Sequence, residues 1–493
     1  MPTSNETTVR KVAVTGMIAR TGALRLGSAA MADIAFLGAA GTVTGSRYLV
    51  TSRDGARGGA GDERVLVDCG MFQGSKELRE RNWEPIPFDA AAIPFVVLTH
   101  AHIDHSGMLP RLVRQGFKGA IVSTLATFEL CRLLLMDAAK LQEEDAAFLN
   151  RKGLTKHTPA LPLFDARDAE RTLERFTTRP YEEWTDLPER IAVRFRNAGH
   201  LLGSATVEMR IREHGKETTL LFSGDLGRYD VPLNPDPEPP PPADAIVMES
   251  TYGDRPHPEG SLYDQMAALV LESMKRGGVL VIPAFAVGRA QQVIYVLNTL
   301  MRQKRIPDLP IHLDSPMAVE ATRIYAAHPA EQEADLGELT ARNVITHATV
   351  EESKALNSFR GPGILISSSG MLTGGRILHH LKRLLPDPRN TVVLVGYQAA
   401  GTRGRMLQDH APTISIHGEQ VQVKAAIADL CGFSGHADTN ELLRWLGALK
   451  ERPKTIYLTH GEPEAAAALA ATLQGKGFTT NVPKLGDVRT LPL

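Results

Sequence analysis

Short apolar runs separated by glycine-containing turns make up the chain from Ile34 onward. IAFLG, RYLVTS, RVLVDCG, FVVLTH and GAIVST are rich in β-branched and aliphatic side chains, which predicts a series of short β-strands. The longer segment TFELCRLLLMDAAKLQEEDAAFL repeats apolar residues at intervals of three and four, which predicts a helix. Strand and helix patterns therefore alternate, and we expect an α/β fold.

A second run of strand and helix patterns follows a proline-rich stretch. Six of the eight residues from Pro235 to Pro242 are proline, and proline fits neither a helix interior nor a central strand. We therefore expect an extended surface connection there and interpret it as a domain boundary. Beyond it, AIVMEST, GGVLVIPAFAVG, LPIHLDSPMA and NTVVLVGY alternate with helical segments, which predicts a second α/β unit with a parallel sheet.

The domain organisation follows from these patterns and from the length of the chain. A chain of 493 residues is too long for one ordinary core, so we expect at least two domains. The last segment returns to chemically active side chains like those of the first unit, which indicates a first domain that is interrupted and then completed. We expect residues 32–245 and 431–493 to form that domain, residues 246–430 to form the inserted one, and residues 1–31 to be a disordered leader.

Composition excludes several classes of protein. Lys and Arg total 55 and Asp and Glu total 56, so any site for a polyanion must be a local patch. The three cysteines, Cys69, Cys131 and Cys431, are widely spaced, which argues against a disulfide scaffold and favours a reducing, cytoplasmic location. No apolar run reaches the roughly 18 residues of a membrane span, so we expect no membrane partner.

One cluster of residues has the composition of a metal site. FVVLTHAHIDHSG places His100, His102, Asp104 and His105 directly after a predicted buried strand. The end of a strand exposes side chains at the rim of an α/β sheet, and zinc accepts imidazole nitrogen and carboxylate oxygen. A purely structural reading is disfavoured, because burying these groups without a partner costs desolvation energy.

Three further residues supply the ligands that this cluster lacks. His200 in NAGHLLGSA, Asp225 in FSGDLGR and His460 in YLTHGEP each follow an apolar strand within a glycine-containing turn. Taken singly, such residues are more often turn residues or helix caps. Together they complete two sets, and we expect Zn²⁺ in each, with Asp225 bridging the ions: His100, His102, His200 and Asp225 in one set, and Asp104, His105, Asp225 and His460 in the other.

THAHIDHSG resembles the HxHxDH signature of the metallo-β-lactamase superfamily. The ordered set of Asp68, this cluster, His200, Asp225 and His460 is similar to the motif series of that superfamily, and the resemblance runs from about Ile34 to the C-terminus. It implies an αββα sandwich with two metal ions, in which Asp68 orients the metal-binding loop. The signature says little about substrate, since thioesterases, lactonases and nucleases share it.

Two further motifs resemble those of the β-CASP branch, whose members are nucleases. MESTYGDR with Glu249 and GFSGHAD with His436 are similar to its motifs A and C, and SSSGMLTGGR and GYQAAGTRGR resemble stretches of bacterial and archaeal RNA-processing members related to the pre-mRNA 3′-end endonuclease. The resemblance implies a metallo-β-lactamase sandwich interrupted by a β-CASP α/β domain. It also implies a zinc-dependent ribonuclease that acts on single-stranded RNA, and a homodimer.

The residue chemistry suits that activity. A leaving 3′ oxygen needs a proton, and the pKa range of histidine allows His436 to supply it as general acid. The charge of Glu249 would orient that ring and raise its pKa. Asp104 would act in catalysis as well as in metal binding. The alternative interpretations are a turn residue for His436 and a salt-bridge partner for Glu249.

The candidate substrate-binding residues lie mostly in serine- and glycine-containing loops. Hydroxyls, backbone amides and arginines there suit the phosphates of a nucleic acid, and we expect contacts from Ser368, Ser369, Gly370, Arg376, Arg289 and Ser434. One departure stands out: some relatives carry a phosphate-contacting histidine shortly after the GYxxxGT stretch, and this chain has Arg405 and Met406 there. His379 and His380, upstream, are expected to be surface or packing residues.

Three rival functions stay open at the level of sequence. A DNA nuclease of the same branch would differ by its contact with the 2′-hydroxyl, which the sequence does not reveal. A small-ester or thioester hydrolase is disfavoured by Glu249 and His436. A catalytically silent scaffold is disfavoured because every expected metal ligand is present.

Overall fold

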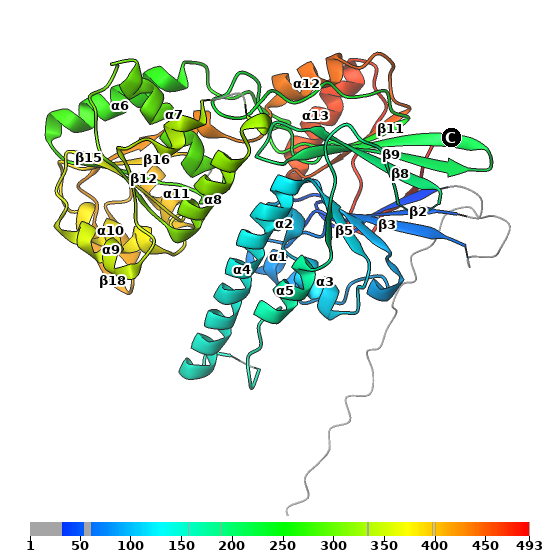
Figure 1. Ribbon diagram of the computed structural model, residues 1–493, viewed down its shortest axis with the longest axis horizontal. Coiled ribbons are helices and arrows are strands. Elements are labelled where there is room, and N and C mark those ends of the chain that lie inside the picture. Colours follow the sequence, from blue (N-terminus) through cyan, green and yellow to red (C-terminus); the bar gives the residue numbers. More distant parts are fainter. Residues whose placement is uncertain are drawn as a thin grey trace, which may run out of the picture.

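The computed structural model describes residues 32–53, 61–155, 157–187, 189–332, 335–396, 398–399 and 401–492. The leader expected over residues 1–31 lies outside these ranges. Two lobes lie side by side in Figure 1: the N-terminal and C-terminal parts of the described chain share one, the sandwich, and the intervening segment forms the other, the cap. The expected α/β sandwich with an inserted α/β domain is confirmed.

Two sheets of seven strands each form the sandwich. The first sheet has the order β22 (Val488–Thr490), β1 (Asp33–Phe36), β2 (Tyr48–Ser52), β3 (Glu63–Val67), β4 (Phe95–Val97), β5 (Ala120–Ser123) and β6 (Phe176–Thr178). The second has the order β21 (Thr480–Asn481), β20 (Thr455–Thr459), β11 (Ala245–Glu249), β10 (Lys216–Phe222), β9 (Ala205–Glu213), β8 (Ile191–Asn197) and β7 (Thr185–Asp186).

Each of these sheets is parallel on one side and antiparallel on the other. Strands β3 to β6 and strands β10, β11, β20 and β21 are parallel, so their carboxyl ends point to the same edge of their sheet. The two inner faces meet in an apolar core, where the ring of Phe36 lies 5.3 Å from that of Tyr457 and the ring of Tyr48 lies 5.7 Å from that of Phe222. The core fixes the sheets relative to each other, and loops at their common edge can be placed accurately.

Helices cover both outer faces of the sandwich. The first sheet carries α1 (Lys76–Arg81), α2 (Ile103–Ser106), α3 (Leu109–Arg114), α4 (Leu125–Lys152) and α5 (Ala166–Leu173), and the second carries α12 (Thr439–Gly447) and α13 (Pro463–Gly475). The predicted long helix is therefore confirmed as α4. It begins where the hydroxyl of Thr124 accepts from the amide of Thr127 and ends at Gly153, whose φ of 61° suits glycine.

The cap is a three-layer α/β unit. Its sheet is parallel throughout, with the order β14 (Val344–Thr346), β13 (Ile311–Asp314), β15 (Gly363–Ser367), β12 (Val279–Pro283), β16 (Thr391–Leu394) and β19 (Ala426–Asp429). Its helices are α6 (Leu262–Arg276), α7 (Arg289–Arg302), α8 (Pro316–Ala327), α9 (Val350–Ala355), α10 (Arg376–Leu384) and α11 (Arg403–Gln408). A hairpin of β17 (Thr413–Ile416) and β18 (Glu419–Gln422) completes it.

The proline-rich stretch does not separate the two lobes. It joins β10 to β11, which are parallel neighbours in the second sheet, and strand β11 also pairs with β20. The boundary expected between residues 245 and 246 therefore falls inside a strand of the sandwich, and the chain leaves for the cap only after Glu249. A run of prolines indicates an extended connection, and extended connections occur within domains as well as between them.

The cap docks on the sandwich through α8, which lies beside α4. His328, just after α8, places Nε2 2.9 Å from the carboxylate of Glu129 on α4 and Nδ1 3.3 Å from that of Glu331. The amide of Leu202 in the sandwich donates to the hydroxyl of Tyr325 on α8, at 3.3 Å. No helix among the described residues is long and apolar enough to cross a membrane.

The contacts of His328 with Glu129 and Glu331 should make the stability of the fold depend on pH. A hydrogen bond to Glu331, working against burial and helped by Glu129, raises the pKa of His328 to about 9. Because this folded-state pKa exceeds the unfolded value of about 6.5, the stabilisation is complete below pH 6.5 and is lost as the pH rises through 9. We expect the melting temperature of the wild type, measured by calorimetry, to fall more between these pH values than that of His328→Gln. Replacing the exposed His214 by Gln is the control, and equal pH profiles for the wild type and His328→Gln would contradict the assignment.

Candidate metal centre

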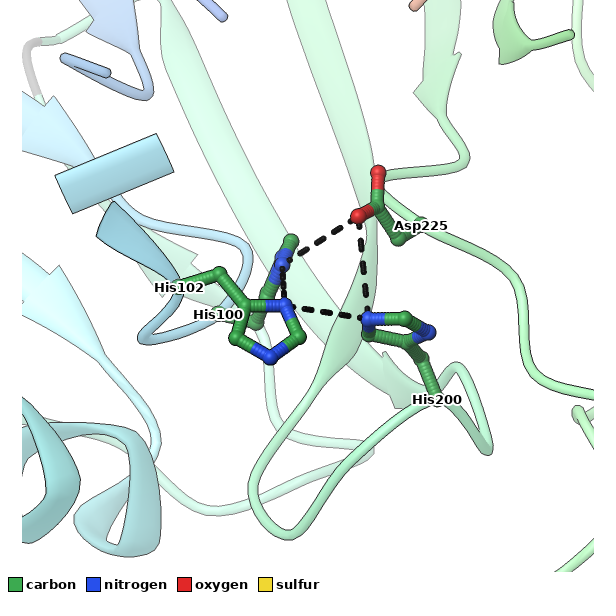
Figure 2. A group of neighbouring side chains, drawn as sticks. All are labelled: His100, His102, His200 and Asp225. Carbon is green, nitrogen blue, oxygen red and sulfur yellow. Dashed lines mark hydrogen bonds and ion pairs between the residues drawn. The ribbon is translucent and has the colours of Figure 1, made fainter. Parts of the chain in front are cut away.

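The residues expected to bind metal meet at the edge where the parallel strands of both sheets end. His100 follows β4, Asp225 follows β10, His460 follows β20, and His200 lies in the turn between β8 and β9. Figure 2 shows His100, His102, His200 and Asp225 converging from different elements on one point. Segments up to 360 residues apart, from His100 to His460, thus contribute to a single site.

The first ligand set has the spacing of a metal site. His102 Nδ1 lies 3.1 Å from both His100 Nε2 and His200 Nε2. Asp225 Oδ2 lies 3.4 Å from His100 Nε2 and 3.6 Å from His200 Nε2. Ligands about 2.0–2.1 Å from a tetrahedral zinc ion are separated from one another by about 3.3–3.4 Å. The four side chains therefore fit one tetrahedral cation.

The second ligand set shares Asp225 with the first. His105 Nε2 lies 3.2 Å from His460 Nε2 and 3.2 Å from Asp225 Oδ1, and Asp104 Oδ2 lies 3.5 Å from His460 Nε2. The two oxygens of Asp225 thus face different sets. The oxygen Oδ1 is buried and has no hydrogen-bond donor among the described residues. A buried carboxylate oxygen without a donor is costly, and a cation between the rings and this oxygen would remove that cost.

The electrostatics of the site favour the protonation states that bind metal. Burial, followed by the neighbouring His105, lowers the pKa of His100 to about 3, and burial lowers that of His102 to about 4. Burial alone would raise the pKa of Asp225, but His460 and the other rings hold it well below its usual range. The imidazoles of His100 and His102 are therefore neutral and the carboxylate of Asp225 is ionised, which are the forms that coordinate zinc.

Asp68 contacts His105 on the side of its ring that faces away from the ligand set. Its carboxylate accepts from the amide and the hydroxyl of Thr99, at 2.8 and 2.9 Å, and lies 2.8 Å from Nδ1 of His105. The contact fixes the ring so that Nε2 points to the ligand set, as expected of a residue that orients a metal ligand. Asp68 itself has a φ of 57°, a left-handed conformation that is uncommon outside glycine and typical of functional sites.

The loop that carries the cluster is braced by backbone contacts. The amide of Ser46 donates to the carbonyl of Asp104 at 2.8 Å, and that of Cys69 donates to the carbonyl of His105 at 2.7 Å. Gly70 is required here, since a Cβ at this position would lie 1.6 Å from the carbonyl oxygen of Asp104.

His436 and Glu249 form a pair beside the metal ligands. Nδ1 of His436 lies 3.2 Å from the nearer oxygen of Glu249, and the centroid of the ring lies 4.6 Å from that of His200, with the two rings tilted by 49°. Glu249 is buried and accepts from the amide of Leu226 at 2.6 Å. Burial opposes the charged ring, but Glu249 and then Asp225 raise the pKa of His436 to about 9. The pair can therefore hold and donate a proton.

Comparison with known proteins identifies the family. Family models match the chain for the metallo-beta-lactamase superfamily over residues 55–265, for a Beta-Casp domain over residues 290–407, and for a Zn-dependent metallo-hydrolase RNA specificity domain over residues 420–483. Ribonuclease TTHA0252 of Thermus thermophilus is 40% identical over 461 residues, which cover 91% of this chain and 98% of that protein. The chain belongs to the β-CASP branch of the metallo-β-lactamase superfamily.

Other relatives are longer or more distant. Proteins named transcription termination factor FttA are 32% identical in Methanosarcina mazei and 36% identical in Pyrococcus abyssi. This chain spans 66% and 60% of their lengths. A crystal structure of a protein of unknown function from Enterococcus faecalis, 13% identical, superposes with a TM-score of 0.54 over 94% of this chain and 100% of that one, which shows a shared fold.

Family membership makes this protein a metal-dependent hydrolase. The ligand sets described above could hold the metal that such an enzyme needs, and the predicted cluster, His200, Asp225 and His460 all belong to them. Motifs A and C of the β-CASP branch, with Glu249 and His436, lie directly against that site.

The expected substrate-binding residues divide into two groups. Ser434 lies in the motif C loop, where its hydroxyl accepts from the amide of His436 at 3.3 Å. Arg289, at the start of α7, reaches that loop, since a Cβ on Gly435 would lie 3.8 Å from its guanidinium. Ser368, Ser369 and Gly370 follow β15 in the cap, at the carboxyl edge of its parallel sheet.

Arg376 has partners that weaken its predicted role. Its Nη1 donates to Asp314 at 2.8 Å and to the carbonyl of His347 at 3.0 Å, and its Nη2 donates to the carbonyl of Ala348 at 2.9 Å. These bonds tie α10 to β13 and leave the guanidinium few free donors. His380 is buried and contacts the same Asp314 at 2.5 Å, in keeping with the packing role expected for it.

Sequence analysis missed His257, which contacts the motif C loop. Its Nε2 lies 2.9 Å from the carbonyl of His436, its amide donates to the carboxylate of Asp438 at 2.6 Å, and its ring packs 4.7 Å from Tyr252. His257 and Tyr252 follow Glu249 closely in the chain, so the only signal in the sequence was this proximity to motif A. The contact holds the backbone of His436 in place.

Replacing Asp68 by Asn tests how the metal loop is held. The amide keeps the size of the side chain but removes the charge that faces His105. We expect metal affinity to fall about 10- to 100-fold, measured by competition with a chromophoric chelator and by metal analysis after dialysis. The exposed Asp186, replaced by Asn, is the matched control, and wild-type affinity in Asp68→Asn would contradict the role given to Asp68.

Proposed function

We propose that this protein is a ribonuclease that hydrolyses phosphodiester bonds of single-stranded RNA with two zinc ions. The observation that carries the proposal is the pairing of His436 with Glu249 next to two ligand sets that share Asp225. A matched family described as an RNA specificity domain, and a relative of equal extent named a ribonuclease, support RNA as the substrate.

The ligand sets fit two cations, and a pair of zinc ions supplies a nucleophilic hydroxide near neutral pH and neutralises charge on the phosphate. His100, His102, His200 and Asp225 would hold one ion. Asp104, His105 and His460 would hold the other, together with Asp225, whose Oδ1 lies 3.2 Å from His105 and 3.5 Å from His460. The chain itself provides the remaining parts of the reaction. Asp225 fixes the spacing of the two sets, and Asp68 fixes the ring of His105.

His436 is the general acid in this scheme. Glu249 faces Nδ1, so Nε2 is the nitrogen that can point to the leaving 3′ oxygen of RNA. With a pKa raised to about 9 the ring is protonated near neutral pH and can transfer its proton as the P–O bond breaks. The products are then a 3′ hydroxyl and a 5′ phosphate.

Arg289 is suited to bind a phosphate next to the cleaved bond. Burial lowers the pKa of its guanidinium to about 10, and its Nε is buried without an acceptor among the described residues. A phosphate oxygen would supply that acceptor and a compensating charge. Ser434 and the loop of Ser368, Ser369 and Gly370 would add neutral contacts.

We further infer a cytoplasmic location and a homodimer. The free, buried Cys69 and Cys131 are consistent with a reducing compartment. The homodimer rests on the family resemblance alone. A termination activity is not proposed, since the relatives that carry that name extend well beyond the part matched here.

Replacing His436 by Ala tests the proposal through the leaving group. Cleavage of an end-labelled single-stranded RNA should fall about 10²- to 10⁴-fold in kcat, because the alkoxide then leaves without a proton. Hydrolysis of bis(p-nitrophenyl) phosphate should fall far less, because a nitrophenolate needs no acid. Gel analysis of the RNA products and absorbance of nitrophenolate measure the two rates.

Controls separate this outcome from general damage. Metal content should stay at about two zinc ions per chain in His436→Ala, and a chelator should abolish both reactions. The matching single-stranded DNA distinguishes the rival nuclease. Equal losses on both substrates with metal retained would contradict the role of His436, and absence of RNA cleavage by the wild type would contradict the proposed function.

A further inference from the structure

A second cavity lies beside the metal centre on the sandwich. It has a volume of about 580 Å³, within the range of about 300–1,000 Å³ typical of small-ligand pockets. Its wall contains Arg47, Phe72 and Arg81, together with apolar side chains that include Ile86 and Leu485. It is far smaller than a protein interface and of a size to hold one nucleotide.

The cavity and the metal centre are separated by a single loop, residues 38–46. On the side of the metal centre, the hydroxyl of Ser46 lies 3.3 Å from Nε2 of His105, and the amide of His460 donates to the carbonyl of Ala39 at 2.7 Å. On the other side, Gly45 packs directly on the ring of Phe72, where a Cβ would lie 2.6 Å from the ring. Residues 38–46 therefore contact both the metal ligands and the wall of the cavity.

The cavity wall contains two guanidinium groups that form no ion pair among the described residues. Arg47 is only 6% exposed, and its Nη2 donates to the carbonyl of Gly70 at 3.2 Å. Its Nε is buried and has no acceptor in the described part of the chain. Arg81 lies over the ring of Phe72, 5.6 Å from its centroid. Burying a guanidinium without a counter-charge costs desolvation free energy. An anion in the cavity would offset that cost.

The acidic residues of the wall do not compensate these charges. Asp487 is 2.7 Å from the guanidinium of Arg489 and is thereby paired. Glu84 is exposed, and water screens its carboxylate. The buried part of the cavity therefore favours an anion, while Ile86 and Leu485 favour a flat apolar group beside it.

We propose that this cavity binds one nucleotide of the RNA strand next to the cleaved bond. Its phosphate accepts from Arg47 and Arg81, and its base lies against the apolar wall of Ile86 and Leu485. The inference rests on the proposed ribonuclease function and adds a subsite to it. The subsite would bind the strand on the side of the metal centre where β1 and β22 lie. Cleavage would then depend on the length of the RNA.

Arg81→Gln is the test variant. Arg81 is half-buried on a short helix, and among the described residues its side chain contacts the ring of Phe72 without forming an ion pair, so the variant should fold. Arg79→Gln, an exposed arginine of the same helix, is the matched control. With a chelator present to prevent cleavage, we expect Arg81→Gln to bind a single-stranded RNA 12-mer about tenfold more weakly than the wild type. The slope of log affinity against log salt should become shallower by about 0.7, as for one lost phosphate contact.

Binding is followed by two readouts independent of turnover. Fluorescence anisotropy of a labelled RNA gives the dissociation constant. Trp83, which is 56% exposed and adjoins Glu84 of the wall, should change its emission when the RNA binds. Bis(p-nitrophenyl) phosphate is too small to reach the cavity from the metals. The metal-loaded Arg81→Gln variant should therefore hydrolyse it at the wild-type rate.

The outcomes separate the subsite from the function on which it rests. If the wild type cleaves RNA and Arg81→Gln binds and cleaves it equally well, the subsite is overturned and the ribonuclease stands. If the wild type hydrolyses the small diester but not RNA, the proposed function fails. In that case the subsite survives only if Arg81→Gln still weakens RNA binding, and it is overturned otherwise. A loss in Arg81→Gln that Arg79→Gln shares would be a general charge effect and would overturn the subsite. A loss confined to Arg81→Gln and growing with RNA length supports it.

Discussion

The carboxylate of Asp225 is the interaction on which the active edge of this protein depends. It is buried, ionised and placed between two groups of imidazoles, with one oxygen toward each group. Such a charge is tolerated in the interior only with positive partners around it. The position of Asp225 after β10 thereby sets where the loops after β4 and β20 must lie, and the core between the two sheets keeps them there.

The order of the chain explains how that edge is completed. Strand β11 pairs with β10 on one side and with β20 on the other, so the second sheet closes only after the cap has been traversed. Glu249 is the last residue of β11, and His436 follows the last strand of the cap. The insertion therefore starts and ends at the two members of the proton-donating pair. A cap of any internal design would leave that pair in place.

Part of this arrangement was predictable from the sequence and part was not. The convergence of the candidate metal ligands was, because four of them fall within six residues and the others follow apolar strands in glycine turns. The boundary at the proline-rich stretch was misplaced, since proline reports backbone conformation and carries no information on which strands pair. The partners of Arg376 and the contact of His257 with His436 depend on packing between distant segments. No local pattern of residue types encodes such contacts.

The attachment of the motif C loop has a consequence for how the two lobes share the work. The amide of Ala437 donates to the carbonyl of Leu226 in the sandwich, and the hydroxyl of Thr439 donates to that of Tyr252. The proton donor thus belongs mechanically to the metal-binding lobe, whereas Arg289 belongs to the cap. Movement of the cap would carry a phosphate-binding cation toward or away from chemistry that is already assembled. The sandwich would then govern how fast a bound strand is cut, and the cap would add to how long that strand stays bound.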